Sequence, residues 1–565
     1  MSKINQANHE RRWILPERTE SNLVDQLLKN RGITDRERFF YPDFERDSHD
    51  PQLLPTMEVA VERMVQAIQH RETIAVYADY DADGIPGGAL LVKLLRANDA
   101  KVVTYIPDRD REGYGLNNMA IELLKQQRVT LIITVDLGIT NHQAVQTAVA
   151  SGIDVIVTDH HGIDPARIPT DAVATVHPAL PGSAYPFHGL AGGAVAWKLA
   201  QAMAQRTGKP SMAALKWWLE LPAISTVCDL VPLVDESRMI VHFGLKVLRQ
   251  TRSVGLRALY QSAGIDPASV DERTIGFQIG PRINAPGRID HASPAMELLL
   301  TEDVNRAREL AEQIETQNKQ RQLLVQRVVS EALAKINTIG ADLPTVIILS
   351  DPGWPVGVLG LAASRIVERY HRPAILLNID ADQRAKGSAR SIEGFNVLEA
   401  ISAQRDLLTS FGGHHGAAGL SLDQAAIADF SAALGEFSAA RLTPELLQPR
   451  YRADAQIKPV ELSESLLTQL DGFAPFGVNN PTPRFVVCPL TVRAVRQLGA
   501  DGQHFKLTFD NWPGSALAWR FAERSVKLPA VGQTMAILGR PEWNVWNGTR
   551  SIQLVIDDWR SADAD

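Results

Sequence analysis

Short apolar runs alternate with amphipathic segments between residues 57 and 158. We expect strands at 73–79, 101–106, 130–135 and 153–158, and helices at 57–70, 86–97, 117–127 and 140–150. Buried parallel strands read as continuous apolar runs, and helices connect them over the faces of the sheet. The pattern predicts an α/β lobe with a doubly wound parallel sheet. In such sheets, ligands gather beyond the carboxyl ends of the strands.

The next part of the chain is predicted to be mostly helical and then α/β again. Residues 190–262 contain clear helical pieces at 191–203 and 216–227, and 297–336 carries almost no glycine or proline. The latter stretch predicts one long connecting helix, or two, joining two lobes. A second, smaller α/β lobe is indicated by strands at 344–350 and 373–378, helices at 357–369 and 423–440, and a glycine-rich stretch at 387–419.

Beyond a linker at 443–452, several short β-rich segments predict a C-terminal β-barrel of the oligonucleotide-binding type. The expected domains are therefore an N-terminal extension (1–56) packed on the next domain, a parallel-sheet domain (57–262), an interlobe segment with the long helix (263–340), a second α/β domain (341–442) and the barrel domain (443–565).

Composition adds few constraints. The chain has 565 residues, of which 45% are hydrophobic and 22% charged, as in ordinary globular proteins. Two cysteines exclude a disulfide framework, and we expect neither a signal peptide nor a membrane span, so the expected location is the cytoplasm. The net charge of −7 does not decide whether a partner is nucleic acid, because a binding groove can be locally basic.

Acidic and imidazole side chains follow three of the expected strands. They are Asp79, Asp81 and Asp83 after the first strand, Asp136 after the third, and Asp159, His160 and His161 after the fourth. Polar groups at the buried end of a strand need partners, and a divalent metal is a suitable partner for carboxylates beside imidazoles. Two Mn²⁺ or Mg²⁺ ions about 4 Å apart need oxygen donors this dense. Three strand ends that point one way predict one metal-loaded crevice.

The order of the motifs resembles a known superfamily. DYDADG, TVDLGI, VTDHHG and VCDLVPL (227–233) are similar, in that order, to the DHH phosphoesterase superfamily. GFQIGPRINAPGRID (276–290), GWPVGVLGLAASRI (353–366), KGSARSIEG (386–394), FGGHHGAAGL (411–420) and FGVNNPTPRF (476–485) resemble the RecJ family of single-stranded-DNA exonucleases within it. The resemblance covers roughly residues 50–560. It implies a DHH lobe, a DHH-associated lobe and an OB-like barrel.

The resemblance also implies roles for individual residues. The implied metal ligands are Asp81, Asp83, Asp136, His160 and Asp229, with Asp79 and His161 completing or orienting that shell and Asp159 holding a histidine in its tautomer. The implied DNA contacts are Arg109 at the 5′ end, Arg282 and Asn284 at the lobe boundary, and Ser388 and Arg390 on the terminal phosphate. His414, beside two glycines, is expected to approach the scissile phosphate.

Four positions depart from the family pattern. Pro86 and Leu137 stand where small polar residues are commoner, Pro286 replaces a frequent alanine, and Pro355 replaces a frequent histidine. None removes a metal ligand, but loss of a histidine at 355 is expected to weaken contacts to the substrate phosphate.

The function that we expect is metal-dependent hydrolysis of single-stranded DNA from 5′ to 3′ to mononucleotides, in DNA repair and recombination. The β-rich region contains Phe505, Trp512, Trp519, Trp543 and Trp546 among Lys506, Arg520 and Arg540, and bases can stack on such rings while the cations contact phosphate. We assign this role to the barrel domain and to no single ring. A helicase and a single-strand-binding protein are expected partners of a monomer.

Two alternatives stay open. One is a phosphodiesterase of short oligonucleotides or cyclic dinucleotides, or a pyrophosphatase, although such relatives are shorter and lack the barrel. The other is a non-catalytic replisome scaffold, although degenerate relatives would have lost acids that are present here.

Overall fold

The computed structural model describes residues 11–562, except 110, 341, 500, 501, 520, 522–527 and 547. Its contacts define two compact units. The parallel-sheet unit comprises Tyr41–Leu323 with Pro475–Asn480, and the barrel unit comprises Met1–Phe40, Leu324–Ala474 and Pro481–Asp565. No helix in the described part of the chain is long and apolar enough to cross a membrane.

The parallel-sheet unit is built on five parallel strands in the order β3-β2-β4-β5-β6. These strands are β2 (Thr73–Ala78), β3 (Lys101–Tyr105), β4 (Val129–Val135), β5 (Asp154–Thr158) and β6 (Ala174–Val176). The first four lie within one residue of their expected bounds. The sequence did not predict β6, because three residues are too few for a recognisable apolar run.

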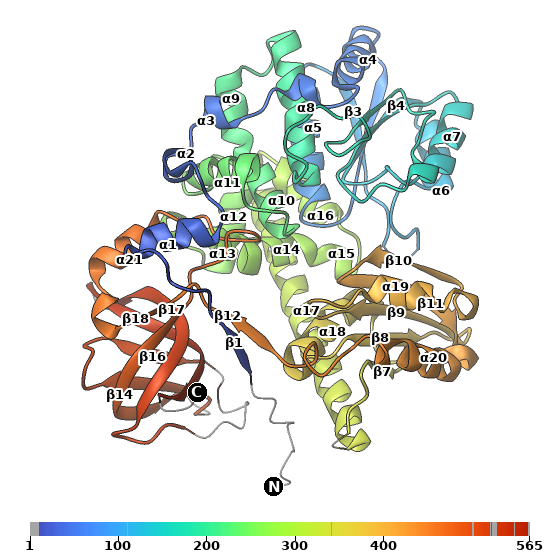
Figure 1. Ribbon diagram of the computed structural model, residues 1–565. Helices are drawn as coiled ribbons and strands as arrows, with labels where there is room; N and C mark the ends of the chain where they lie inside the picture. The colour runs from blue at the N-terminus through green and yellow to red at the C-terminus, as the bar shows by residue number, and fades with distance from the viewer. Residues whose placement is uncertain are drawn as a thin grey trace. The chain divides into compact units, whose positions relative to one another are not determined.

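Helices cover both faces of this sheet, so the doubly wound fold is confirmed (Figure 1). Alternate residues of β2 point to opposite faces. Ile74 and Val76 pack with α4 (Met57–Gln69), α5 (Gly84–Ala97) and α8 (Gly192–Thr207), whereas Ala75 and Tyr77 pack with α6 (Asn118–Gln126) and α7 (His142–Ala150).

The rest of the unit is helical, as expected. Its helices are α3 (Phe44–Asp47), α9 (Met212–Lys216), α10 (Glu220–Cys228), α11 (Asp235–Leu248), α12 (Val254–Ala263), α13 (Glu272–Thr274), α14 (Gly280–Asn284), α15 (Pro286–Ile289) and α16 (Ser293–Leu300), with a π-helical turn, η5 (Ile275–Ile279). The long helix α17 (Val304–Ile339) follows. The 297–336 stretch is thus two helices, because Asp303 Oδ1 accepts hydrogen bonds from Asn305 N (2.7 Å) and Arg306 N (3.0 Å) and begins a new helix.

The second α/β lobe has a mixed sheet in the order β10-β11-β9-β8-β7. Its elements are β7 (Ile347–Ser350), α18 (Val356–Tyr370), β8 (Ala374–Ile379), β9 (Arg384–Arg390), α19 (Val397–Ser402), β10 (Ser410–His414), β11 (Ala417–Asp423) and α20 (Ile427–Ala439). Only β7 and β8 are parallel. The glycine-rich stretch therefore forms antiparallel strands, which its composition did not indicate because glycine is depleted in strands.

The C-terminal barrel is closed, as predicted. Its ring consists of β14 (Phe485–Leu498), β15 (His504–Phe509), β16 (Ser515–Ala518), β18 (Thr549–Ser561) and β17 (Thr534–Trp546), and it closes because β14 also pairs with β17. Before the barrel come β12 (Arg450–Arg452), β13 (Ala455–Ile457), which pairs with β14, and α21 (Glu464–Asp471).

The N-terminal extension differs from the expectation. Residues 41–56 belong to the parallel-sheet unit, but β1 (Arg12–Ile14), α1 (Leu23–Asn30) and α2 (Arg36–Phe40) belong to the barrel unit. The reason is specific pairing: β1 lies parallel to β12, and the rings of Phe39 and Phe40 meet Phe473 edge-on.

Candidate metal centre

Three adjacent strands deliver acids to one edge of the parallel sheet. Asp79 follows β2, Asp136 follows β4, and Asp159 follows β5. The ladder continues past the strand ends, since Asp79 N donates to Val135 O and Asp136 N donates to Thr158 O, each at 3.1 Å. The chain leaves β2 toward β3 on one side, and β4 lies on the other side. This is the switch point at which ligands bind in doubly wound sheets.

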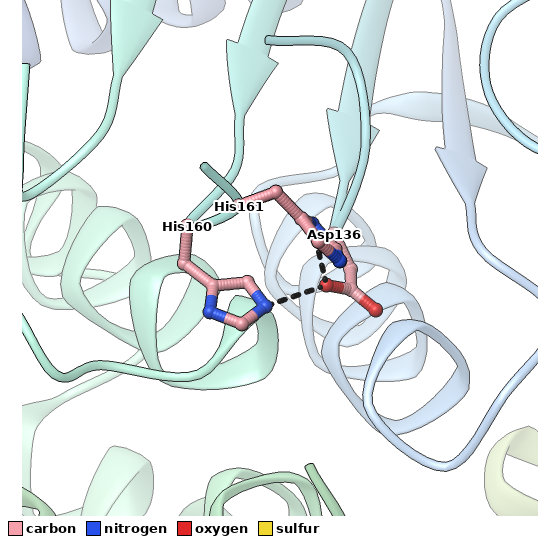
Figure 2. A group of neighbouring side chains, drawn as sticks. All are labelled: Asp136, His160 and His161. Atoms are coloured by element: carbon pink, nitrogen blue, oxygen red, sulfur yellow. Dashed lines mark ion pairs between the residues drawn. The ribbon is translucent and has the colours of Figure 1, made fainter. Parts of the chain in front are cut away.

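His160 lies at the centre of the acids. Its Nε2 is 3.1 Å from Asp136 Oδ1, 3.5 Å from Asp83 Oδ2 and 3.6 Å from Asp229 Oδ2. Figure 2 shows His160 and His161 both reaching toward Asp136. Three groups of potential ligand atoms, each within 4.8 Å, are Asp136, His160 and His161; Asp83, His160 and Asp229; and Asp79, Asp81 and Asp136. The structure thus brings together every residue expected to hold a metal.

The donor set fits divalent cations. Asp79 Oδ1, Asp136 Oδ1 and His160 Nε2 are buried and make no hydrogen bond to any described residue. Buried polar atoms nearly always have hydrogen-bond partners, so these three atoms are candidates to coordinate a bound cation. Carboxylate-rich sites with imidazole and no thiolate suit Mn²⁺ or Mg²⁺.

Without cations the acids repel one another. Burial, and then the charges of neighbouring aspartates, raise the pKa of Asp79 and Asp136 well above the usual range and that of Asp229 to about 8. Burial lowers the pKa of His160, which favours the neutral imidazole that a metal requires. Bound cations would offset this repulsion and lower the pKa of the carboxyl groups, because they stabilise the ionised carboxylates.

Asp159 organises the two histidines rather than joining the groups of ligands. Its Oδ1 accepts from His160 N (2.7 Å) and lies 2.8 Å from His161 Nδ1, and its Oδ2 accepts from Ile139 N (2.9 Å). Burial opposes both ionised forms, but the contact with His161 lowers the pKa of Asp159 and raises that of His161 to about 9. These bonds support the expected role of Asp159 in holding a histidine.

Asp83 is fixed by the start of α8. Its two oxygens accept from Gly192 N (2.8 Å) and Gly193 N (2.6 Å), and Ser225 Oγ donates to it as well. A Cβ on Gly192 would lie 2.6 Å from the Cβ of Asp136, so only glycine permits this approach. The sequence did not indicate Ser225, because nothing in its local pattern marks a residue that faces the centre from α10.

Tyr114 is a second residue that sequence reasoning missed. Its hydroxyl donates to Asp136 O at 3.0 Å and lies 3.1 Å from His161 Nδ1. The tyrosine lies five residues after Arg109 in the chain. A loop's path over the strand ends cannot be predicted from spacing, so the sequence gave no sign of this contact.

Two arginines expected at DNA have partners within the parallel-sheet unit. The Arg109 guanidinium lies 5.2 Å from the centre of the Tyr80 ring. Tyr80 stands between Asp79 and Asp81 in the chain. Arg282 Nε donates to Glu315 at 2.7 Å. Contacts of these two arginines with DNA stay predictions.

Asn284 contacts the metal loop, which is formed by residues 81–83. Its Oδ1 accepts from Ala82 N at 2.8 Å, and Ala82 separates two of the expected ligands. Whatever it does at DNA, Asn284 fixes the backbone of this loop.

The remaining expected residues share one face of the mixed sheet in the barrel unit. His414 pairs with Ala417, and Ala417 pairs with Arg390, so the three occupy one row across β10, β11 and β9. Arg390 Nη1 donates to Ser388 Oγ at 2.9 Å, and a Cβ on Gly360 of α18 would lie 2.5 Å from Arg390 Nη2. An arginine, a hydroxyl and an imidazole on one face form a surface suited to phosphate.

Three family models match the chain: the DHH family, N-terminal domain (residues 73–226), the DHHA1 domain (343–440) and the RecJ OB domain (453–558). The single-stranded-DNA-specific exonuclease RecJ of Bacillus subtilis strain 168 is 39% identical, with 95% of this chain and 67% of that protein covered. Its namesake from Salmonella typhimurium is 33% identical, with 90% of each covered. The crystal structure of RecJ in complex with Mn²⁺ from Thermus thermophilus superposes with a TM-score of 0.82 at 29% identity, covering 98% of this chain and 80% of that one.

Proposed function

The chain belongs to the RecJ family of single-stranded-DNA-specific exonucleases, and we propose that it hydrolyses single-stranded DNA from the 5′ end to mononucleotides with two Mn²⁺ or Mg²⁺ ions. One observation carries the proposal. His160 Nε2 lies within 3.6 Å of carboxylates from three separate segments, in a site where three buried ligand atoms make no hydrogen bond to any described residue.

The ions and the side chains would contribute different parts of the reaction. Two such ions lower the pKa of a water molecule and neutralise the charge of an in-line phosphoryl transition state. The residues that would hold them are Asp81, Asp83, Asp136, His160 and Asp229, with Asp79 and His161 completing the set. Asp159 would keep the imidazole of His161 and the backbone of His160 oriented, and the α8 amides keep Asp83 in place.

The barrel unit would hold the substrate. Ser388, Arg390 and His414 offer hydrogen bonds to the terminal or scissile phosphate. On the barrel, the Trp519 side chain is 49% exposed and lies edge-on to His504, so a base can stack there. By contrast, Phe505 and Trp512 are buried in the barrel core, and Arg520 and the Trp546 side chain lie outside the described residues.

This combination favours the exonuclease over the alternatives. A phosphodiesterase of very short substrates has no need of a barrel, and a scaffold has no need of a complete ligand set. We further propose that the enzyme acts as a monomer in DNA repair and recombination, beside a helicase and a single-strand-binding protein.

Incubation of the purified chain with Mn²⁺ or Mg²⁺ and a 5′-labelled single strand tests the proposal. We expect labelled mononucleotide as the first product, no attack on blunt duplex and little on a dinucleotide. Asp136→Ala is expected to lower the rate by more than about 100-fold, because Asp136 belongs to two of the groups of potential ligands. Asp171→Ala, at an exposed aspartate of the same unit, is the control. Cleavage of the dinucleotide alone, or an unaffected Asp136→Ala variant, would contradict the proposal.

A further inference from the structure

A short segment between α21 and β14 packs with the parallel-sheet unit, although both flanks belong to the barrel unit. This segment, Pro475–Asn480, is a closed loop of defined shape. Gly477 and Asn480 exchange two backbone hydrogen bonds (2.9 and 3.1 Å), and Asn480 Nδ2 donates to Pro475 O at 2.9 Å. Asn480 is only 1% exposed, so its side chain serves the loop rather than solvent.

The segment docks on the loop that carries a metal ligand. Residues 229–234 connect α10 to α11, with Asp229 at the start and Leu233 near the end. Leu233 N donates to Val478 O at 2.8 Å, and Leu233 itself is buried. A Cβ on Gly477 would lie 3.0 Å from Leu233 Cδ2, so the segment packs against this leucine without a gap.

Charged groups of two helices hold the segment from other sides. Arg238 of α11, itself buried, donates from Nη1 to Pro475 O at 3.3 Å. The Phe476 backbone N–H donates to the Glu272 carboxylate at the start of α13. The segment is therefore a fixed part of the parallel-sheet unit, and the loop packs against a rigid surface.

Asp229 depends on this support more than its neighbours do. Its side chain is 27% exposed, against 1% for Asp83 and 3% for Asp136. Asp83 receives three hydrogen bonds, whereas no group in the described part of the chain donates one to the Asp229 carboxylate. Leu230, the next residue, is 70% exposed with a left-handed backbone (φ 60°). The position of Asp229 is thus set mainly by the backbone of its loop.

We propose that Pro475–Asn480 is a positioning element for the metal ligand Asp229, with Gly477 and Asn480 as its positioning residues. The inference rests on the proposed function only in that Asp229 holds an ion. Losing the Asn480 side chain opens the segment, and a larger residue at 477 displaces Leu233. Either change lets Asp229 move away from His160 and weakens binding of the ion between them.

Titration of the full-length, metal-free protein with Mn²⁺, by calorimetry or by the electron paramagnetic resonance of free Mn²⁺, tests the proposal. Asn480→Ala and Gly477→Val are expected to lower the affinity of one Mn²⁺ by about tenfold or more, as for residues that orient metal ligands. Nuclease activity should recover at high Mn²⁺, and affinity for single-stranded DNA in EDTA should not change. Val478→Thr is the matched control, because only the backbone of this 41% exposed residue is used.

The outcomes are distinct. Wild-type Mn²⁺ affinity in both variants would overturn the proposal, and so would an activity loss that high Mn²⁺ does not reverse. A variant that unfolds is replaced by Leu233→Ala, which removes the same packing from the other side and carries the same expectation. An inactive wild-type protein would refute the proposed function, yet the Mn²⁺ titration would still test the positioning element.

Discussion

At the scale of single residues, the centre depends on side chains that hold other side chains or the backbone. Asn284 binds Ala82, 202 positions away in the chain, and thereby fixes the loop between Asp81 and Asp83. Asp159 does the same for the histidines, and Tyr114 links its own loop to the Asp136 backbone. Residues that orient metal ligands typically change affinity or activity 10- to 100-fold when removed.

Asn284→Ala tests this role. We expect the Mn²⁺ concentration for half-maximal activity to rise by about tenfold, because the metal loop loses its acceptor. Affinity for single-stranded DNA in EDTA should stay the same, and Asn284→Asp, which keeps an oxygen acceptor, should behave more like the wild type. Weaker DNA binding with an unchanged Mn²⁺ requirement would instead assign Asn284 to DNA.

Residue type and position predicted the cluster of potential metal ligands but not all of the residues that support it. An aspartate at the end of an apolar strand is visible in the sequence, and parallel topology then forces Asp79, Asp136 and Asp159 to one edge. Asp229 and the roles of the arginines came from resemblance. Tyr114 and Ser225 were missed because a hydroxyl that reaches a carboxylate or carbonyl across the fold leaves no periodic or compositional signal.

At the scale of elements, α11 and the residue that follows it carry three cationic side chains near His242. His242 lies one helical turn from Arg238 and from Lys246, and Arg249 follows one turn after Lys246. Burial, and then these three cations, lower the pKa of His242 to about 4. In the unfolded chain a histidine titrates near 6.5. The folded state therefore disfavours the protonated form, and stability present above pH 6.5 decreases as the pH falls from 6.5 toward 4.

His242→Gln should remove this contribution. We expect the Tm to drop less between pH 7 and pH 5 in the variant than in the wild type, measured by calorimetry in EDTA. His70→Gln, at a histidine whose side chain is 61% exposed, should keep the wild-type dependence. An identical drop in His242→Gln and the wild type would show that this histidine does not contribute to acid lability.

Elements with strong periodicity were predictable, and glycine-rich ones were not. The four longer strands of the parallel sheet lie within one residue of expectation. Burial on both faces leaves a continuous apolar signal in β2, β4 and β5. Strands β9 to β11 did not show in the pattern, because they are rich in glycine and small residues, which are depleted in strands and give little apolar alternation. The three-residue β6 lacked length.

At the scale of the whole molecule, the barrel is expected to supply grip rather than chemistry. Trp519→Ala should weaken binding of a long single strand by about tenfold, because stacking on one ring contributes about 1–3 kcal/mol. Cleavage of strands too short to reach the barrel should be nearly unchanged. Val531→Ala, at a residue of the same barrel that is 68% exposed, is the control. Equal loss on long and short strands would contradict the role of Trp519 as a stacking platform.

The packing of Pro475–Asn480 within the parallel-sheet unit also affects how deletion variants are interpreted. A truncation after the linker at 443–452 looks, along the sequence, like clean removal of the barrel. It would also remove Pro475–Asn480, the six residues that pack against the Asp229 loop. The activity of such a shortened enzyme would then combine two unrelated defects, a lost hold on the nucleic acid and a loosened cation. Only point substitutions can separate them.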